Sequence, residues 1–312
     1  MALRVAIQMD ALSSINPKSD TTLLMAREAQ ARGHDIFYYT PDTLTYREGT
    51  VTARGHKVQF LEGEKFYELG AEWHEPMHDM DVVLLRQDPP FNMTYLSTTY
   101  LLEQLQPDVL VVNNPTAVRN FPEKIFPTLL EDFMPPTLIT ADIRAIEDFR
   151  KDYQDIIIKP LYGFGGHAIL RIKPDDQNFN ALMEMHFSTS SEPIQVQKFL
   201  PEVTTEDRRI IMIDGEVAGV LGRIPADDDV RANLRVGGKA AKVELTHRQR
   251  AMCDELGDTL RETGIIFAGV DMIGDYLTEI NITSPTGMVA INKLHNVKLE
   301  ATFWDAVESY VG

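Results

Sequence analysis

The sequence contains a single cysteine, an excess of acidic over basic residues, and no long apolar run. Cys253 alone cannot form an internal disulfide, which indicates a reducing compartment, and its helical surroundings favour a packing role over a nucleophilic one. The net charge of −17, from 30 basic and 47 acidic residues, argues against a nucleic-acid partner. No apolar stretch suits a membrane span, and the short run Val5 to Met9 lacks a signal-peptide layout. We therefore expect a cytoplasmic protein with no membrane partner.

The sequence also lacks the glycine-rich turn that follows the first strand of dinucleotide-binding domains. Residues 3–9 predict a buried strand, residues 21–32 a helix capped by Asp20, and residues 35–40 a second strand. This β-α-β order predicts a parallel sheet. Residues 9–14 contain no glycine, so we do not expect this part of the chain to hold a dinucleotide phosphate in the usual way.

A further strand, over residues 82–86, ends in an arginine beside a rigid loop. Pro89 and Pro90 stop any helix there and force an extended backbone. Arg86 is therefore well placed to meet a ligand carboxylate, although a surface arginine paired with Asp88 would produce the same pattern. A helix over residues 94–105 and a strand over 109–113 complete the expected first domain.

The middle of the chain alternates prolines, strands and glycines. Five prolines between residues 114 and 136 suggest a connecting region, and Lys124 lies inside it. We then expect a strand over residues 137–140, a helix from Asp142 to about residue 153, and a strand–glycine loop–strand unit over 155–172. A helix near 179–187 and a strand near 194–200 follow.

The glycines of that unit are Gly163, Gly165 and Gly166. They let backbone N–H groups approach phosphate oxygens, and Lys159 at the end of the entering strand can neutralise phosphate charge. A plain hairpin turn is the alternative. The loop is not a Walker motif, because no Gly-Lys-Ser/Thr follows and the next element is a strand.

Residues 206–225 predict a second hairpin, turned at Asp214-Gly215. Arg209 and Arg223 lie on its two arms, where they either converge on an anion or are scattered surface arginines. The polar segment 226–241 follows and is typical of a mobile lid. A helix over residues 246–263 comes next, and a helical stretch over 289–310 ends the chain.

A third hairpin, over residues 269–285, carries acidic side chains inside apolar strands. Glu279 and Asn281 are two residues apart and therefore share one face of their strand. A three-residue loop at 274–276 would pair Asp271 with Glu279 and bring all three side chains together, whereas a two-residue loop would send Asp271 to the opposite face. We expect the three-residue loop. Oxygen ligands of this kind suit magnesium; solvated acids on an exposed hairpin are the alternative.

The order of these features resembles the ATP-grasp superfamily, and within it bacterial glutathione synthetase. The resemblance covers essentially the whole chain. It rests on Arg86-Gln87-Asp88-Pro89-Pro90-Phe91, Glu123-Lys124, Ile158-Lys159-Pro160-Leu161, Asn233-Leu234-Arg235-Val236-Gly237-Gly238 and Glu279-Ile280-Asn281-Ile282-Thr283-Ser284-Pro285.

The resemblance implies a role for each candidate residue. Those implied to bind ATP are Lys124, Lys159, Gly163, Gly165, Gly166, Gln197, Lys198, Phe199, Leu200 and Asp207. Those implied to stabilise the transferring phosphate are Arg209 and Arg223. Those implied to bind the peptide substrate are Arg86, Asp88, Asn281, Thr283, Ser284, Gly237 and Gly238. Asp271, Glu279 and Asn281 are implied to hold two Mg²⁺ ions, with Mn²⁺ as a substitute.

The implied fold is mixed α/β. An N-terminal parallel-sheet domain (residues 1–120) precedes a two-part ATP-grasp fold: a central lid subdomain (121–200) and a C-terminal catalytic subdomain (201–312) with a mobile loop at 226–241. The implied activity joins γ-glutamylcysteine to glycine with consumption of ATP, in a homo-oligomeric enzyme. The alternatives are another ATP-grasp amino-acid ligase, of the D-alanine–D-alanine or glutamate-adding type, and a non-catalytic nucleotide-binding module.

Overall fold

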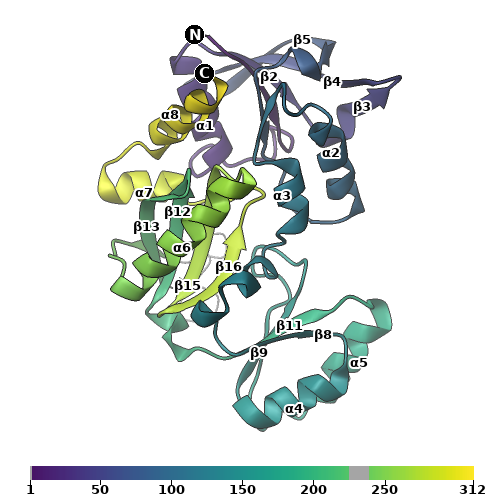
Figure 1. Ribbon diagram of the computed structural model, residues 1–312, viewed down its shortest axis with the longest axis vertical. Coiled ribbons are helices and arrows are strands. Elements are labelled where there is room, and N and C mark those ends of the chain that lie inside the picture. Colours follow the sequence, from purple (N-terminus) through teal and green to yellow (C-terminus); the bar gives the residue numbers. More distant parts are fainter. Residues whose placement is uncertain (1, 225–238) are drawn as a thin grey trace.

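The computed structural model describes residues 2–224 and 239–312 of the chain. Three β-sheets organise these residues, one of seven strands, one of four and one of five. In Figure 1 the seven-stranded sheet lies at one end of the molecule, the four-stranded sheet at the other, and the five-stranded sheet between them. The expected mixed α/β class is confirmed.

The seven-stranded sheet contains the predicted parallel unit. Its strands are β1 (Arg4–Gln8), β2 (Asp35–Tyr39), β3 (Leu44–Arg47), β4 (Thr50–Phe60), β5 (Tyr67–Pro76), β6 (Val82–Leu85) and β7 (Leu110–Val112). Strands β2, β1, β6 and β7 are parallel neighbours in that order, and β3, β4 and β5 extend the sheet by antiparallel pairing. Helix α1 (Thr21–Ala31) begins as predicted at Asp20, whose carboxylate accepts the N–H of Leu23.

The proline-rich region after β7 is more ordered than a connecting loop. Helix α2 (Met93–Glu103) precedes β7, and helix α3 (Pro115–Asn120) begins directly after it. A 3₁₀ segment, η3 (Phe126–Phe133), follows. Prolines are accepted in the first turn of a helix, where the missing N–H has no partner in any case, so the region that the prolines suggested to be a connection contains short helical segments.

The four-stranded sheet has its own hydrophobic core. Its strands are β8 (Thr137–Thr140), β9 (Ile156–Pro160), β10 (Leu170–Ile172) and β11 (Ile194–Lys198), in the antiparallel order β10-β9-β11-β8. Helices α4 (Ile143–Tyr153) and α5 (Phe179–Thr189) cover one face (Figure 1). Ile146, Ile158 and Val196 belong to a buried cluster separate from the rest of the core.

The five-stranded sheet carries both remaining hairpins. Its strands are β12 (Asp207–Ile213), β13 (Glu216–Ile224), β14 (Lys239–Ala241), β15 (Phe267–Ile273) and β16 (Tyr276–Asn281), in the antiparallel order β14-β13-β12-β15-β16. Asp214 and Gly215 both have positive φ, as a two-residue hairpin turn of the predicted kind requires. Helix α6 (His247–Thr263) buries Cys253, and burial raises the pKa of that thiol to about 12, which accords with a packing role.

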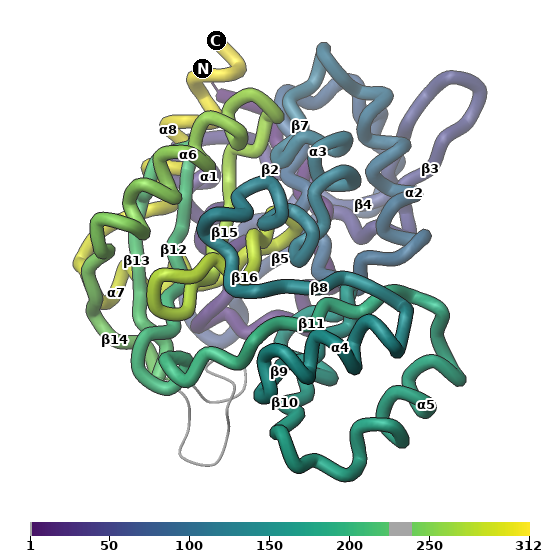
Figure 2. Tube along the Cα trace, turned by 60° about the horizontal axis from the view of Figure 1, so that its bottom comes forward, coloured from purple at the N-terminus to yellow at the C-terminus, as the bar shows by residue number. Residues whose placement is uncertain are grey.

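Two helices, not one continuous helix, end the chain. Helix α7 (Met288–His295) stops where Asn296 adopts a left-handed conformation, and helix α8 (Leu299–Val311) starts in a new direction. The indole N–H of Trp304 donates to the carbonyl of Met25 at 2.7 Å, so α8 packs against α1 (Figure 2). Within the described residues, no helix has the length and apolar character that a membrane crossing would need.

Candidate functional site

The β15–β16 hairpin places its two acids opposite each other by a route that differs from the expected one. Ile273 pairs with Tyr276, so the loop has two residues, and the expectation of three was wrong. An extra residue, Thr278, then bulges out of β16 between the pairs Met272–Leu277 and Asp271–Glu279, and its hydroxyl donates to the carbonyl of Asp271 at 3.0 Å. The bulge shifts the register by one residue, so Asp271 faces Glu279 after all.

Two arginines from the neighbouring hairpin converge on Asp271. Arg209, on β12, makes a bidentate pair with this carboxylate at 2.5 and 2.8 Å. Arg223, on β13, approaches the same carboxylate at 3.3 Å and donates to Asp207 at 2.6 Å. All four side chains are largely buried, and the amide of Asn281 lies 3.5 Å from Asp271. The convergence expected of the two arginines is present, and the anion between them is the protein's own Asp271.

Two lysines converge in the same way on Glu279. Lys159, at the end of β9, lies 3.3 Å from its carboxylate, and Lys124 lies 3.9 Å away. Burial favours the protonated form of Glu279, but the two ammonium groups outweigh burial and hold its pKa well below the ordinary range. Lys159 belongs to the four-stranded sheet and Glu279 to the five-stranded sheet, so the contact between them spans the two sheets.

Glu123 is a half-buried acid of this cluster; the sequence analysis named it in the motif Glu123-Lys124 but gave it no role. Its carboxylate lies 2.7 Å from the ammonium of Lys124. Burial, together with the nearby charge of Glu279, raises the pKa of Glu123 to about 7. Its place beside Lys124 in that motif was the signal that could have pointed to it.

The glycine loop between β9 and β10 contacts one of the two lysines directly. The carbonyl of Gly163 accepts a hydrogen bond from Lys124 at 2.6 Å, which ties the loop to the cluster. Gly165 and Gly166 both have positive φ, a conformation that glycine adopts readily. Gly165 faces the cavity that contains Arg209 and Arg223, and Gly166 faces a cavity next to it.

That neighbouring cavity, of about 130 Å³, lies between the four- and five-stranded sheets. The residues predicted to bind a nucleotide that line it are Lys159, Gly166, Gln197, Lys198, Phe199, Leu200 and Asp207. Burial raises the pKa of Asp207 to about 6 even though Arg223 pairs with it. The cavity also reaches Asp271 and Glu279, so it joins the mostly apolar end near Leu200 to the charged cluster.

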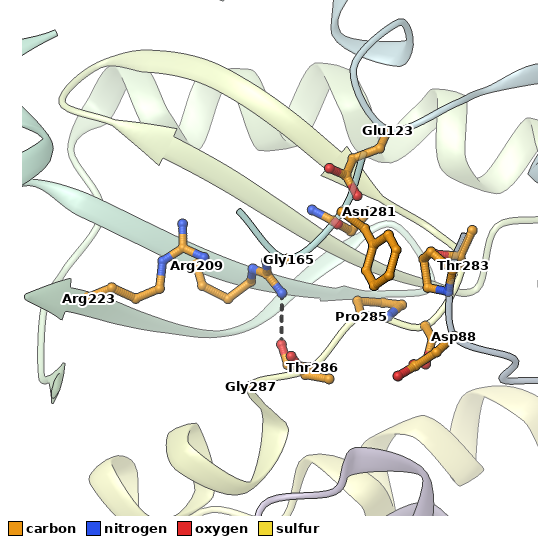
Figure 3. Close-up of a pocket in the computed structure, with 13 residues that line it drawn as sticks. Asp88, Glu123, Gly165, Arg209, Arg223, Asn281, Thr283, Pro285, Thr286 and Gly287 are labelled. Atoms are coloured by element: carbon orange, nitrogen blue, oxygen red, sulfur yellow. Dashed lines mark hydrogen bonds between the residues drawn. The ribbon is translucent and has the colours of Figure 1, made fainter. Parts of the chain in front are cut away.

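A second cavity, of about 70 Å³, collects the residues predicted to bind the peptide (Figure 3). Asp88, Thr283 and Ser284 line it together with Asn281 and both arginines. Figure 3 also shows Arg209 donating to the carbonyl of Thr286, at 2.9 Å. Gly237 and Gly238, and most of the expected mobile loop at 226–241, lie outside the described residues.

The remaining predicted residue, Arg86, lies in a third and larger cavity of about 650 Å³. It is buried, donates to the hydroxyl of Thr22 and to the carbonyl of Pro285, both at 3.0 Å, and is not the surface arginine of the alternative interpretation. The third cavity shares Asp88, Thr286 and Gly287 with the second. The second cavity also shares Arg223 with the 130 Å³ cavity, so it lies between the other two.

The oxygen donors of the cluster suit a hard divalent cation only in part. Within residues 2–224 and 239–312, no three His, Cys, Asp or Glu side chains are grouped so as to hold a metal ion by themselves. Asp271, Glu279 and Asn281 lie on the same face of one hairpin, beside a cavity with room for a ligand. This fits magnesium, which takes one or two carboxylates and completes its shell with water and substrate phosphates.

Comparison with known proteins matches almost the entire chain. The prokaryotic glutathione synthetase N-terminal domain matches residues 3–119, and the prokaryotic glutathione synthetase ATP-grasp domain matches residues 123–296. The glutathione synthetase of Brucella melitensis is 49% identical over 311 residues, covering 99% of each chain. That of Mesorhizobium japonicum is 48% identical over 309 residues, also with 99% of each chain covered.

Solved structures with the same fold are more distant in sequence. The ATP-grasp ligase PsnB, complexed with a minimal precursor, is 18% identical with a TM-score of 0.65, and all of both chains is covered. D-cycloserine synthetase DcsG is 13% identical with a TM-score of 0.70, covering 99% of this chain and 100% of that one. These likenesses establish the ATP-grasp fold, and the matches over the full length establish more: the chain belongs to the prokaryotic glutathione synthetase family.

Proposed function

We propose that this chain is a glutathione synthetase, an ATP-dependent ligase that joins γ-glutamylcysteine to glycine and releases ADP and phosphate. Identity near 49% over the full chain favours this activity over that of other ATP-grasp amino-acid ligases. Lys124, Lys159 and Glu279 are all present and lie together, which argues against a non-catalytic module. The observation that carries the proposal is the gathering of four cationic side chains around Asp271 and Glu279, where two cavities share Arg223.

The 130 Å³ cavity between the four- and five-stranded sheets suits the nucleotide base. The N–H groups of Lys198 and Phe199 already donate to the carbonyls of Pro136 and Asp155. No described acceptor is paired with the N–H of Leu200, so this group is the donor available to an adenine ring. Asp207 lies further along the same cavity, toward the ribose. Gln197 is held by its own bond to Thr137 and serves as a wall, a smaller role than the resemblance implies.

The lysines then receive the phosphates. Lys124, Lys159 and the glycine loop lie next to one another, so a triphosphate running from Leu200 toward Arg209 passes all three. As the lysines turn to the phosphates, the carboxylate of Glu279 gives up its ammonium partners. Asp271, Glu279 and Asn281 are the residues that would hold Mg²⁺, two ions in our proposal, with Mn²⁺ able to substitute; the cations would offset charge on the transferring phosphoryl group.

The chemistry proceeds in two displacements. An oxygen of the cysteinyl carboxylate attacks the γ-phosphorus of ATP, and the bond from this phosphorus to the β-phosphate oxygen breaks. ADP departs, and the peptide carboxylate has become an acyl phosphate. The glycine nitrogen then attacks the acyl carbon, phosphate departs with the bonding electrons, and the amine loses a proton. Arg209 and Arg223 face this cavity and stabilise charge on the transferring group. Asp88, Thr283 and Ser284 line the side where the peptide carboxylate enters.

The larger organisation follows the same proposal. We assign residues 1–120 to a substrate-binding domain, 121–200 to a central ATP-grasp subdomain, and 201–312 to a catalytic subdomain. The separate core of the four-stranded sheet supports the boundary between the central and catalytic subdomains, near residue 200. We also propose a cytoplasmic homo-oligomer acting on small molecules.

The direct test is phosphate release with ATP, Mg²⁺, γ-glutamylcysteine and glycine, omitting each in turn, with the thiol product identified by mass spectrometry. We expect phosphate and glutathione in equal amounts, and neither when any component is missing. Release of phosphate with D-alanine, but not with γ-glutamylcysteine and glycine, would overturn the proposal.

A further inference from the structure

Three residues at one end of the four-stranded sheet hold the segment that we assign to the nucleotide base. Asp155 directly precedes β9, Arg171 lies on β10, and Phe199 directly follows β11. Strand β9 pairs with β10 on one side and with β11 on the other, so the three residues lie close together. None of them has a role in the proposed chemistry beyond the place of Phe199 in the cavity wall.

Asp155 makes two separate contacts within this group. Its backbone carbonyl accepts the N–H of Phe199 at 2.9 Å, and its carboxylate accepts two hydrogen bonds from the guanidinium of Arg171, at 2.6 and 3.1 Å. A bidentate pair of this kind fixes the plane of the guanidinium as well as its position. The guanidinium carbon then lies 3.5 Å from the centre of the Phe199 ring. The backbone and the ring of Phe199 are therefore both held by the same two residues.

Phe199 carries this constraint into the 130 Å³ cavity. Phe199 and Leu200 line the cavity, whereas Arg171 is not among the described residues that line it. The N–H of Leu200, which is the donor available to an adenine ring, belongs to the peptide unit that joins Phe199 to Leu200. A rotation of Phe199 would turn this N–H away from the base. Arg171 can therefore influence the base through Phe199 without touching it.

The pair of Arg171 and Asp155 is better suited to orienting Phe199 than to stabilising the fold. The two side chains are 29% and 30% exposed. Partly exposed ion pairs contribute modestly to the free energy of unfolding, because water screens their charges. A guanidinium held over an aromatic face still restricts the movement of the ring. Loss of the pair should therefore affect nucleotide binding more than unfolding.

We propose that Arg171 is a positioning residue for the nucleotide base: with Asp155 it fixes Phe199 and so aims the N–H of Leu200 at adenine. The inference rests on the proposed function and deepens it, because it names residues that set the choice of nucleotide. Adenine presents a ring nitrogen acceptor to such a donor, whereas guanine presents an N–H at the same place. A rigid donor therefore favours ATP over GTP, since two opposed donors would both lack a partner.

Arg171→Lys tests this role. Lysine keeps the positive charge but has neither the planar fork nor the bidentate pair. We expect the KM of ATP to rise about 5–20-fold, with kcat within about twofold of the parent value and the KM of glycine unchanged. The preference for ATP over GTP, as a ratio of kcat/KM values, should fall about fivefold or more. The melting temperature should stay within about 2 °C of that of the parent enzyme.

A double-mutant cycle shows whether Arg171 acts through Phe199. Phe199→Leu keeps an apolar wall and removes the ring that Arg171 covers. In that background Arg171→Lys should change the KM of ATP less than about twofold, because the group on which it acts is gone. Asp155→Asn weakens the pair but keeps the backbone carbonyl that accepts the N–H of Phe199. It should raise the KM of ATP in the same direction as Arg171→Lys, by about 3–10-fold.

Arg150 provides a matched control within the same subdomain. Its guanidinium carbon lies 4.8 Å from the centre of the Phe179 ring. It also donates to the backbone carbonyls of Lys173, Pro174 and Asp176. Neither Arg150 nor Phe179 lines the 130 Å³ cavity. Arg150→Lys makes the same chemical change at the same kind of contact, and it should leave the KM of ATP and the preference over GTP unchanged.

The outcomes separate the positioning role from the proposed function. If Arg171→Lys kept the parental KM of ATP and the parental preference over GTP, the positioning role would be wrong. It would also be wrong if this variant lost melting temperature and kcat while the KM of ATP held, or if Arg150→Lys raised the KM of ATP equally. A parent enzyme that forms no glutathione would overturn the proposed function instead. Calorimetric binding of ATP and GTP to the same variants would then still test Arg171.

Discussion

Replacing Glu279 with glutamine tests the centre of the site. The carboxylate lies 3.3 Å from Lys159 and 3.9 Å from Lys124, whose side chains are only 9% and 4% exposed. Removing one partner of a buried ion pair costs about 3–5 kcal/mol when nothing replaces it. Here Glu123 stays 2.7 Å from Lys124, and the glutamine oxygen can still accept a hydrogen bond. We therefore expect the free energy of unfolding to fall by about 1–3 kcal/mol, and the fold to survive.

The effect of Glu279→Gln on catalysis should be larger than the effect on folding. Glutamine has the shape of glutamate but no charge to offer a cation bound with ATP. Losing one electrostatic group that acts on the transition state lowers kcat by about 10²–10³-fold. Phosphate release at saturating substrates measures this loss, and circular dichroism with thermal melting measures the fold.

Glu216→Gln is the matched control, because Glu216 is an exposed acid of the same sheet whose ion-pair partner among residues 2–224 and 239–312 is the surface residue Arg261. It should change neither rate nor stability appreciably. If Glu279→Gln folded normally and retained a rate within about threefold of the parent, the assignment of Glu279 to the reacting phosphates would be refuted.

Three further predictions concern other parts of the molecule. Lys159→Gln should raise the KM of ATP at least about tenfold with little change in that of glycine, measured by steady-state kinetics. Gly269→Ala should lower kcat and cost about 1–3 kcal/mol of stability in thermal melts, because the new Cβ would lie 2.8 Å from Pro285 and 3.3 Å from Arg209. Burial lowers the pKa of His34, so the unfolded chain binds its proton more readily. The contribution of His34 to the free energy of unfolding is therefore fully present above about pH 6.5. It falls as the pH drops below that value, by at most about 1.4 kcal/mol per pH unit, and His34→Gln should reduce this fall in urea titrations.

Elements with a local cause could be predicted from the sequence. Asp20 and Asp142 cap their helices as expected because a capping carboxylate acts on amides two or three residues away. The Asp214-Gly215 turn formed because both positions tolerate positive φ. In each case the information lies within a few residues of its effect.

The charged cluster shows where local pattern stops being informative. The facing of Asp271 and Glu279 was expected, but from a loop of the wrong length, since nothing in the sequence marks Thr278 as a bulge. Lys124 lay in what looked like a connector, yet it is buried by partners 39 and 155 residues away, Gly163 and Glu279. A bulge within one hairpin decides the first case, and contacts between residues far apart in the chain decide the second. A single sequence shows them only through resemblance to a family.

The charge balance of the cluster leads to a last prediction, about how ATP and the metal depend on each other. Four buried or nearly buried cations face four carboxylates: Lys124, Lys159, Arg209 and Arg223 against Glu123, Asp207, Asp271 and Glu279. Glu123, whose pKa is about 7, is part protonated at neutral pH, so the site carries only a small positive charge before any ligand binds. A triphosphate brings several negative charges into a region that has little positive charge to spare.

Binding of ATP and binding of the divalent cation should therefore stabilise each other. In calorimetric titrations we expect ATP to bind at least about tenfold more tightly with Mg²⁺ than without it, and by linkage the metal to bind more tightly with ATP by the same factor. Glu279→Gln, with one negative charge fewer, should bind metal-free ATP at least as well as the parent enzyme does and lose most of the mutual enhancement. Equal affinities for ATP with and without Mg²⁺ in the parent enzyme would mean that the carboxylates balance the lysines and arginines permanently, and that the metal binds elsewhere.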